Sequence, residues 1–156
     1  MARRAFGPAL ARILRKRLAA LLADADKAFK RGRDVELHAL RIDVKRLRYT
    51  LEFAVPLVRD EAMGALDLLA LLQERLGDLA DADTFGRTYA SVAEGVPAGD
   101  PRRSGLDTLI ALAERDRERA LEAVRALWRG EDAPYPERLA ASISATLGSL
   151  SPKDAP

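Results

Sequence analysis

Apolar residues recur every three or four positions along most of the chain, with polar residues between them, which is typical of amphipathic helices. The pattern predicts six helical segments, which cover about residues 8–31, 34–56, 60–77, 78–93, 104–130 and 135–150. Short connections between long helices make neighbours antiparallel. The sequence therefore predicts an all-α fold, an antiparallel helical bundle of about five to six helices.

Glycine and capping residues set the predicted helix ends. Gly32 and Gly77 are expected to end the first and third helices, and Asp34 is expected to cap the second. We divide the chain into a helical bundle over residues 1–130 and a C-terminal extension over residues 131–156. The extension is expected to hold the short last helix and a disordered end over its last six residues.

The segment from Leu37 to Phe53 has an unusual order of residue types around its predicted helix. At about 100° per residue, two apolar stripes flank a row of charged residues. The first apolar stripe consists of Leu37, Leu40, Val44, Leu47 and Leu51. The charged row, which we call the cationic stripe, consists of His38, Arg41, Lys45, Arg48 and Glu52. The second apolar stripe consists of Ile42, Tyr49 and Phe53.

A surface helix normally keeps its charges opposite its apolar face, so this order needs an explanation. If both apolar stripes pack against neighbours, the cations line a groove inside the bundle. Burying unpaired cations costs several kcal/mol per ion, and Glu52 is the only acid on the stripe. A polyanionic ligand would supply the missing charge. The alternative is a solvated face with basic residues placed by chance, and the pattern leaves both interpretations open.

Three pieces of sequence resemble one known family. The run His-x-x-Arg-x-x-x-Lys-Arg-Leu-Arg-Tyr-x-x-Glu, which starts at His38, is similar to the signature helix of the CHAD domain, the conserved histidine α-helical domain. The segment from Leu72 to Asp81 resembles the Leu-Gln-x-x-Leu-Gly-x-x-x-Asp segment that follows in that family. The long helix with Arg117 and Trp128 resembles its closing helix more weakly. The resemblance covers roughly residues 8–130.

The resemblance implies a helical bundle that binds inorganic polyphosphate. The residues expected to contact polyphosphate are His38, Arg41, Lys45, Arg48, Tyr49, Arg17 and Arg117. A full CHAD domain has two similar halves, each with its own signature helix, whereas this chain has one such helix and one His. It therefore resembles the C-terminal half alone, and we expect a homodimer in which two cationic stripes come together.

Two of these arginines have alternative interpretations. Arg17 lies beside the apolar stripe of the first helix, where it either faces the same groove as Arg41 and Lys45 or snorkels at the edge of the core. Arg117 lies within the apolar stripe of the helix over 104–130, where it either pairs with a carboxylate or points into an anion-binding cavity. His38 either donates a hydrogen bond to a phosphate oxygen or lies at the core edge.

Charge is distributed unevenly along the chain. Residues 1–59 hold 15 Lys and Arg against 6 Asp and Glu, and residues 60–156 hold 11 against 18. This asymmetry favours an anion-binding N-terminal part. Nucleic acid or an acidic protein partner remain alternatives, although aromatic residues for base stacking are only 5% of the chain. No apolar run is long enough to span a membrane, and no signal-peptide pattern is present, so we expect a cytoplasmic protein.

The sequence offers little support for catalysis or a cofactor. A glycine-rich phosphate loop is absent, there is no Cys, and the Ser residues cluster near the C-terminus, away from His38. Asp78, Asp81 and Asp83 are expected to cluster at a junction between two helices, where Asp usually caps a helix rather than binding a metal. We therefore expect no catalytic residue, no metal and no cofactor.

Overall fold

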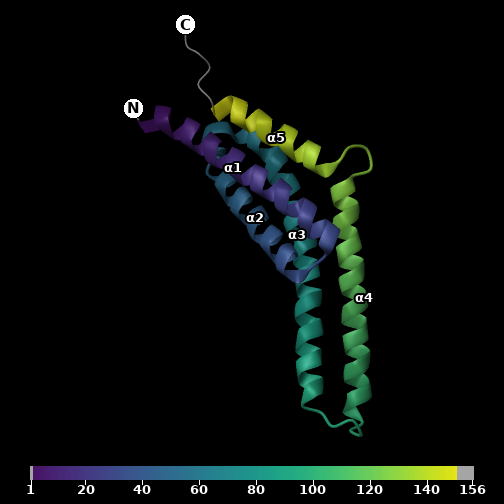
Figure 1. Ribbon diagram of the computed structural model, residues 1–156. Helices are drawn as coiled ribbons and strands as arrows, with labels where there is room; N and C mark the ends of the chain where they lie inside the picture. Colours follow the sequence, from purple (N-terminus) through teal and green to yellow (C-terminus); the bar gives the residue numbers. More distant parts are fainter. Residues whose placement is uncertain (1, 151–156) are drawn as a thin grey trace. The chain divides into compact units, whose positions relative to one another are not determined.

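The computed structural model describes residues 2–150, and the side chains of residues 6–150 (Figure 1). The described residues form five helices and no strand, which confirms the predicted all-α helical bundle. The helices are α1 (Ala2–Arg31), α2 (Asp34–Glu52), α3 (Val55–Glu94), α4 (Arg102–Arg129) and α5 (Tyr135–Leu150). The end expected to be disordered, residues 151–156, lies outside the described residues. No helix among those described is both long and apolar enough to cross a membrane.

The chain divides into two compact units, and the division falls within α3 and α4. The first, which we call the helical body, contains α1, α2, the part of α3 up to Gln73, and residues 127–150. The second, which we call the hairpin, contains residues 74–126. The C-terminal extension thus belongs to the same unit as α1 and α2 through its helix α5.

In the helical body, α1 packs along α2 (Figure 1). Gly32 adopts a left-handed backbone with φ of 64°, and its N–H donates to the carbonyl of Ala28 at 2.7 Å, which ends α1 as predicted. The predicted apolar stripe of α2, from Leu37 to Leu51, is buried at all five positions. The core therefore fixes which side of α2 faces its neighbours.

Helix α5 is anchored to the first part of α3. Tyr135 is fully buried, and its hydroxyl donates to the backbone carbonyl of Leu68. The hydroxyl of Thr146 donates to the carbonyl of Glu61 at 2.9 Å. The Trp128 ring contacts the rings of both Phe29 and Tyr135, with centroid distances of 5.1 and 5.6 Å. These contacts attach α5 to the helical body. Its observed bounds agree with the short helix predicted over residues 135–150.

The hairpin joins the second part of α3 to α4 through a loop at residues 95–101 (Figure 1). The Arg103 guanidinium closes this loop by donating to the carbonyls of Ala93 at 2.8 Å and Val96 at 3.3 Å. The prediction that Gly77 ends a helix is wrong, because α3 continues through it to Glu94. Asp78, Asp81 and Asp83 therefore lie inside one helix and not at a junction.

Several predicted boundaries shift for local reasons. Helix α1 begins at Ala2, so Pro8 lies inside it and removes only one backbone donor near its start. Arg33, and not Asp34, is the N-cap of α2, and its extended backbone has ψ of 144°. Helix α3 begins at Val55 and is kinked at Val58, just before the predicted start near residue 60.

Candidate functional site

The candidate site lies on α2, in the helical body. The helix has no Gly or Pro, begins with Asp34 and Glu36 in its first turn, and runs without interruption to Glu52. Side chains three and four positions apart on such a helix are neighbours, about 5–6 Å apart at Cβ. His38, Arg41, Lys45 and Arg48 therefore follow one another along one flank of the buried stripe.

Arg41 and Lys45 combine partial burial with the absence of a partner. Both are half-buried, and neither makes a hydrogen bond or ion pair within the described part of the chain. The Nε atom of Arg41 is enclosed without an acceptor. Because buried donors are normally satisfied, this guanidinium lacks part of its expected hydrogen bonding. The remaining half-buried Lys and Arg residues that the structure describes all have partners.

Arg48 is the paired member of the row. Its Nε lies 3.2 Å from the Glu52 carboxylate, and its Nη1 donates to the Gln73 side-chain oxygen at 3.2 Å. Gln73 was not among the predicted site residues, although it lies in the Leu-Gln segment quoted for the family resemblance. The structure thus brings the two sequence motifs into contact, through Arg48 and Gln73.

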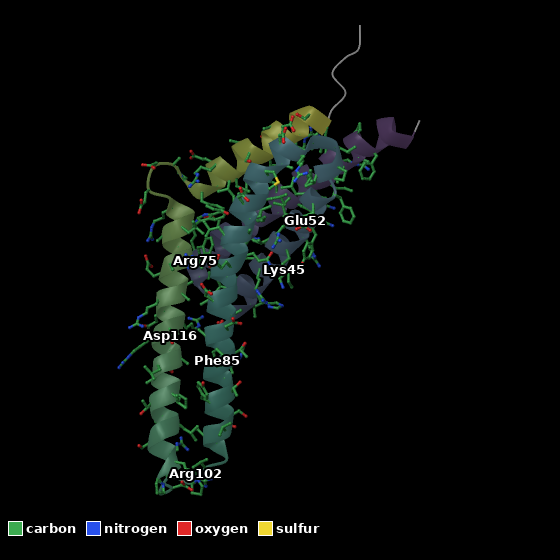
Figure 2. All side chains as sticks on the ribbon, turned by 180° about the vertical axis from the view of Figure 1, so that it is seen from behind. Lys45, Glu52, Arg75, Phe85, Arg102 and Asp116 are labelled. Atoms are coloured by element: carbon green, nitrogen blue, oxygen red, sulfur yellow. The ribbon has the colours of Figure 1, made fainter. Side chains whose placement is uncertain are left out.

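The second apolar stripe of α2 remains open. Tyr49 is 50% exposed and Phe53 is 70% exposed, while Ile42 is half-buried. The expectation that both apolar stripes pack and enclose the cations is therefore not met by the described residues. His38 is also exposed. Figure 2 labels Lys45 and Glu52, which lie along α2.

Arg17 does not join this row. Its guanidinium donates to the carbonyl of Arg46 and to the hydroxyl of Thr50. On a helix with 3.6 residues per turn, Thr50 and Lys45 lie on opposite flanks of the buried stripe. Arg17 thus fastens α1 to the other flank of α2. Arg31, at the end of α1, lies 3.4 Å from the Glu36 carboxylate.

Arg117 belongs to the hairpin, where its Nε lies 2.5 Å from the Asp83 carboxylate. Asp83 is 12% exposed and Arg117 is 29% exposed, so the pair is largely shielded from water. Of the two alternatives from the sequence, pairing with a carboxylate is the one observed. Among the described residues, no three His, Cys, Asp or Glu side chains gather closely enough to hold a metal ion.

The comparisons with known proteins bear on this arrangement. A family model, described as the CHAD domain, matches residues 1–90, which is more than half of the chain. The chain belongs to the CHAD domain family. Members of this family are associated with polyphosphate binding, and the CHAD domain is not a known catalytic domain. The comparison with curated proteins and the comparison with solved structures found no match.

The extent of the match agrees with a partial CHAD domain, as the single signature helix predicts. It includes all of α1 and α2 and the α3 residue Gln73, so the flank with Arg41 and Lys45 lies inside the family region. It ends before α4, so the weaker resemblance of the helix with Arg117 and Trp128 lies beyond the matched residues.

Proposed function

We propose that this CHAD domain binds inorganic polyphosphate, without catalysis, through His38, Arg41, Lys45, Arg48 and Tyr49 on α2. The observation that carries the proposal is the pair Arg41 and Lys45, two half-buried cations without a partner in the described part of the chain. Holding two such charges side by side costs free energy in the unliganded protein, because they repel each other and lose part of their hydration. A linear polyanion relieves both costs.

The residue types suit phosphate recognition. The Arg41 guanidinium can donate two parallel hydrogen bonds to a phosphate, and the Lys45 ammonium acts as a compact point charge. The imidazole of His38 and the hydroxyl of Tyr49 can donate to further phosphate oxygens. Because these groups are spaced along one helix flank, several successive phosphates of one chain can be bound together. Arg17 and Arg117 are left out of the proposed site because each has a partner elsewhere.

Single-stranded nucleic acid is a second candidate ligand. The exposed rings of Tyr49 and Phe53 lie on the flank next to Lys45, and exposed aromatic rings beside cations can stack with bases. Polyphosphate has no aromatic group, so it would use the Tyr49 hydroxyl but stack on neither ring. The two ligands can be distinguished by competition, because only nucleic acid gains from the aromatic rings.

The proposal is tested by fluorescence anisotropy with end-labelled long-chain polyphosphate. We expect saturable binding near 50 mM NaCl that weakens steeply near 300 mM, because ion pairing and counterion release dominate the affinity. Unlabelled polyphosphate should displace the label at lower phosphate concentration than single-stranded or duplex DNA. Absence of binding at the lower salt concentration, or tighter binding of either DNA, would contradict the proposal.

A further inference from the structure

The hairpin contains a groove between α3 and α4 that is separate from the polyphosphate site proposed on α2. Its volume is about 400 Å³, within the range of small-molecule pockets. The Phe85 and Tyr89 rings line it from α3, and their centroids are 6.3 Å apart with the ring planes 16° from parallel. Leu109 and Leu112 line it from α4, and Phe85 remains 55% exposed.

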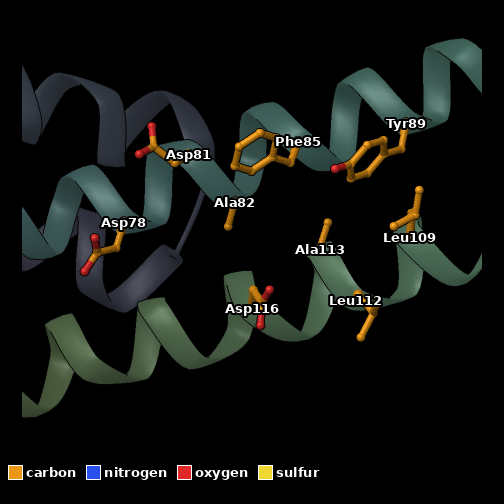
Figure 3. Close-up of a pocket in the computed structure, with 9 residues that line it drawn as sticks. All are labelled: Asp78, Asp81, Ala82, Phe85, Tyr89, Leu109, Leu112, Ala113 and Asp116. Carbon is orange, nitrogen blue, oxygen red and sulfur yellow. The ribbon is translucent and has the colours of Figure 1, made fainter.

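One end of this groove is acidic. Asp78 and Asp81 from α3 and Asp116 from α4 are among the residues that line it, and no Lys, Arg or His is. Figure 3 shows Asp78 and Asp81 toward one end, Asp116 across from Phe85, and the Tyr89 ring and Leu109 toward the other end. The groove therefore has a negatively charged end and an apolar aromatic end.

The neighbouring cations neutralise these carboxylates only weakly. Arg75 lies 3.6 Å from Asp78, and Arg119 lies 3.4 Å from Asp116. Both are solvent-exposed pairs within one helix, a type that contributes little to stability and is easily replaced. Asp81 has no hydrogen-bond or ion-pair partner among the side chains described.

We propose that this groove binds an organic cation with an apolar or aromatic body. The carboxylate end would hold the cationic group, and the body would cover the Phe85 and Tyr89 rings, which attract cations through their faces and bury apolar surface. The carboxylates would repel a polyanion, so this site and the one proposed on α2 select ligands of opposite charge. The proposal does not depend on polyphosphate binding.

Benzyltrimethylammonium is a suitable probe, because it carries a permanent positive charge on an aromatic body. We expect titration of the full chain, followed by amide NMR, to shift the signals of residues 78–89 and 109–116 in a saturable manner. Benzyl alcohol, a neutral compound with the same ring, should bind several-fold more weakly. Equal binding of the alcohol, or no saturable shift of these signals, would overturn the proposal.

Two variants and a matched control locate the binding. Asp81→Asn removes the unpaired charge, and Phe85→Leu keeps apolar volume but removes the ring. Phe85→Leu should weaken binding of the probe by about two- to fivefold, the range of a cation–π contact at an exposed site. Asp81→Asn should weaken it by up to about fivefold, the range of an exposed ion pair. Glu114→Gln removes an equal charge from an exposed position on α4 that does not line the groove, and should leave the affinity unchanged. If Glu114→Gln lowers the affinity for the probe as much as Asp81→Asn does, the effect is one of overall charge, and the proposed site is contradicted.

Discussion

Asp43 shows how a single half-buried carboxylate acts in the helical body. Burial, followed by its hydrogen bond and charge repulsion with Asp24, raises the pKa of its carboxyl, while Arg46 and Arg17 oppose this shift. The folded state therefore binds a proton at Asp43 more tightly than the unfolded chain does. The resulting stabilisation is present at pH values below the unfolded pKa and is lost as the pH rises through the folded pKa.

Because the pKa of Asp43 is raised, its charged form is unfavourable in the folded protein, and this leads to a prediction for Asp43→Asn. The variant keeps a hydrogen-bonding side chain but has no charge to bury, so its unfolding temperature at pH 7 should exceed that of the wild type by about 2 °C. The difference should disappear near pH 3, below the ordinary Asp pKa of about 3.9. Asp67→Asn, at an exposed position of α3, serves as the control and should change little at either pH. An Asp43→Asn variant that is less stable at pH 7 would show that the charge is needed by Arg17 and Arg46.

Some features of the candidate site could be predicted from the sequence, and others could not. The spacing placed Arg41, Lys45 and Arg48 on one flank of α2, because helical periodicity fixes which residues share a side. The i,i+4 spacing of Arg48 and Glu52 is compatible with the ion pair that they form within α2. The spacing could not show that Arg48 also contacts Gln73, or that Arg17 donates to the Arg46 carbonyl, because these are contacts between helices that no local pattern encodes.

At the scale of elements, one of two helix ends predicted from glycines is observed and the other is not. The sequence predicts that Gly32 and Gly77 each end a helix, but among the described glycines only Gly32 and Gly130 adopt a positive φ. The apolar spacing does continue across Gly77, through Leu76 and Leu79 into the core. That continuity was the available signal, since one Gly within a helix costs only about 1 kcal/mol.

Helix α5 carries a second prediction at this scale, which tests its attachment to α3. Tyr135→Phe removes the hydroxyl that donates to the Leu68 carbonyl but keeps the buried ring. It should lower the free energy of unfolding by about 1 kcal/mol, the net value of one hydrogen bond. Tyr49→Phe changes an exposed hydroxyl and should have almost no effect in the same urea titration. Equal stability of Tyr135→Phe and wild type would show that this bond contributes nothing to holding α5.

At the scale of the whole molecule, a family domain with one signature helix suggests assembly. A second copy related by a two-fold axis would bring two sets of Arg41 and Lys45 to one polyanion, and could cover the exposed Phe53. We therefore predict that light scattering at tens of micromolar protein gives twice the monomer mass, at least when polyphosphate is present. A monomer mass both with and without polyphosphate would contradict the homodimer.

The central claim is that polyphosphate binds the flank of α2 with Arg41 and Lys45, and a pair of charge-matched double variants tests it most directly. Arg41→Gln with Lys45→Gln removes the two half-buried cations without partners, whereas Arg12→Gln with Lys16→Gln removes two exposed cations at the same spacing on α1. The α2 variant should lose at least about tenfold in affinity for labelled polyphosphate at 150 mM NaCl, where exposed charges are largely screened. The α1 variant should lose less than about threefold.

Thermal melts of the same proteins separate binding from folding. Because Arg41 and Lys45 have no partner among the described residues, the α2 variant should melt at the wild-type temperature or above it, as repulsion between the two cations is relieved. We therefore expect an α2 variant that is folded, at least as stable as the wild type, and poor at binding polyphosphate. An α2 variant that binds polyphosphate as well as the α1 variant does would contradict the proposed site.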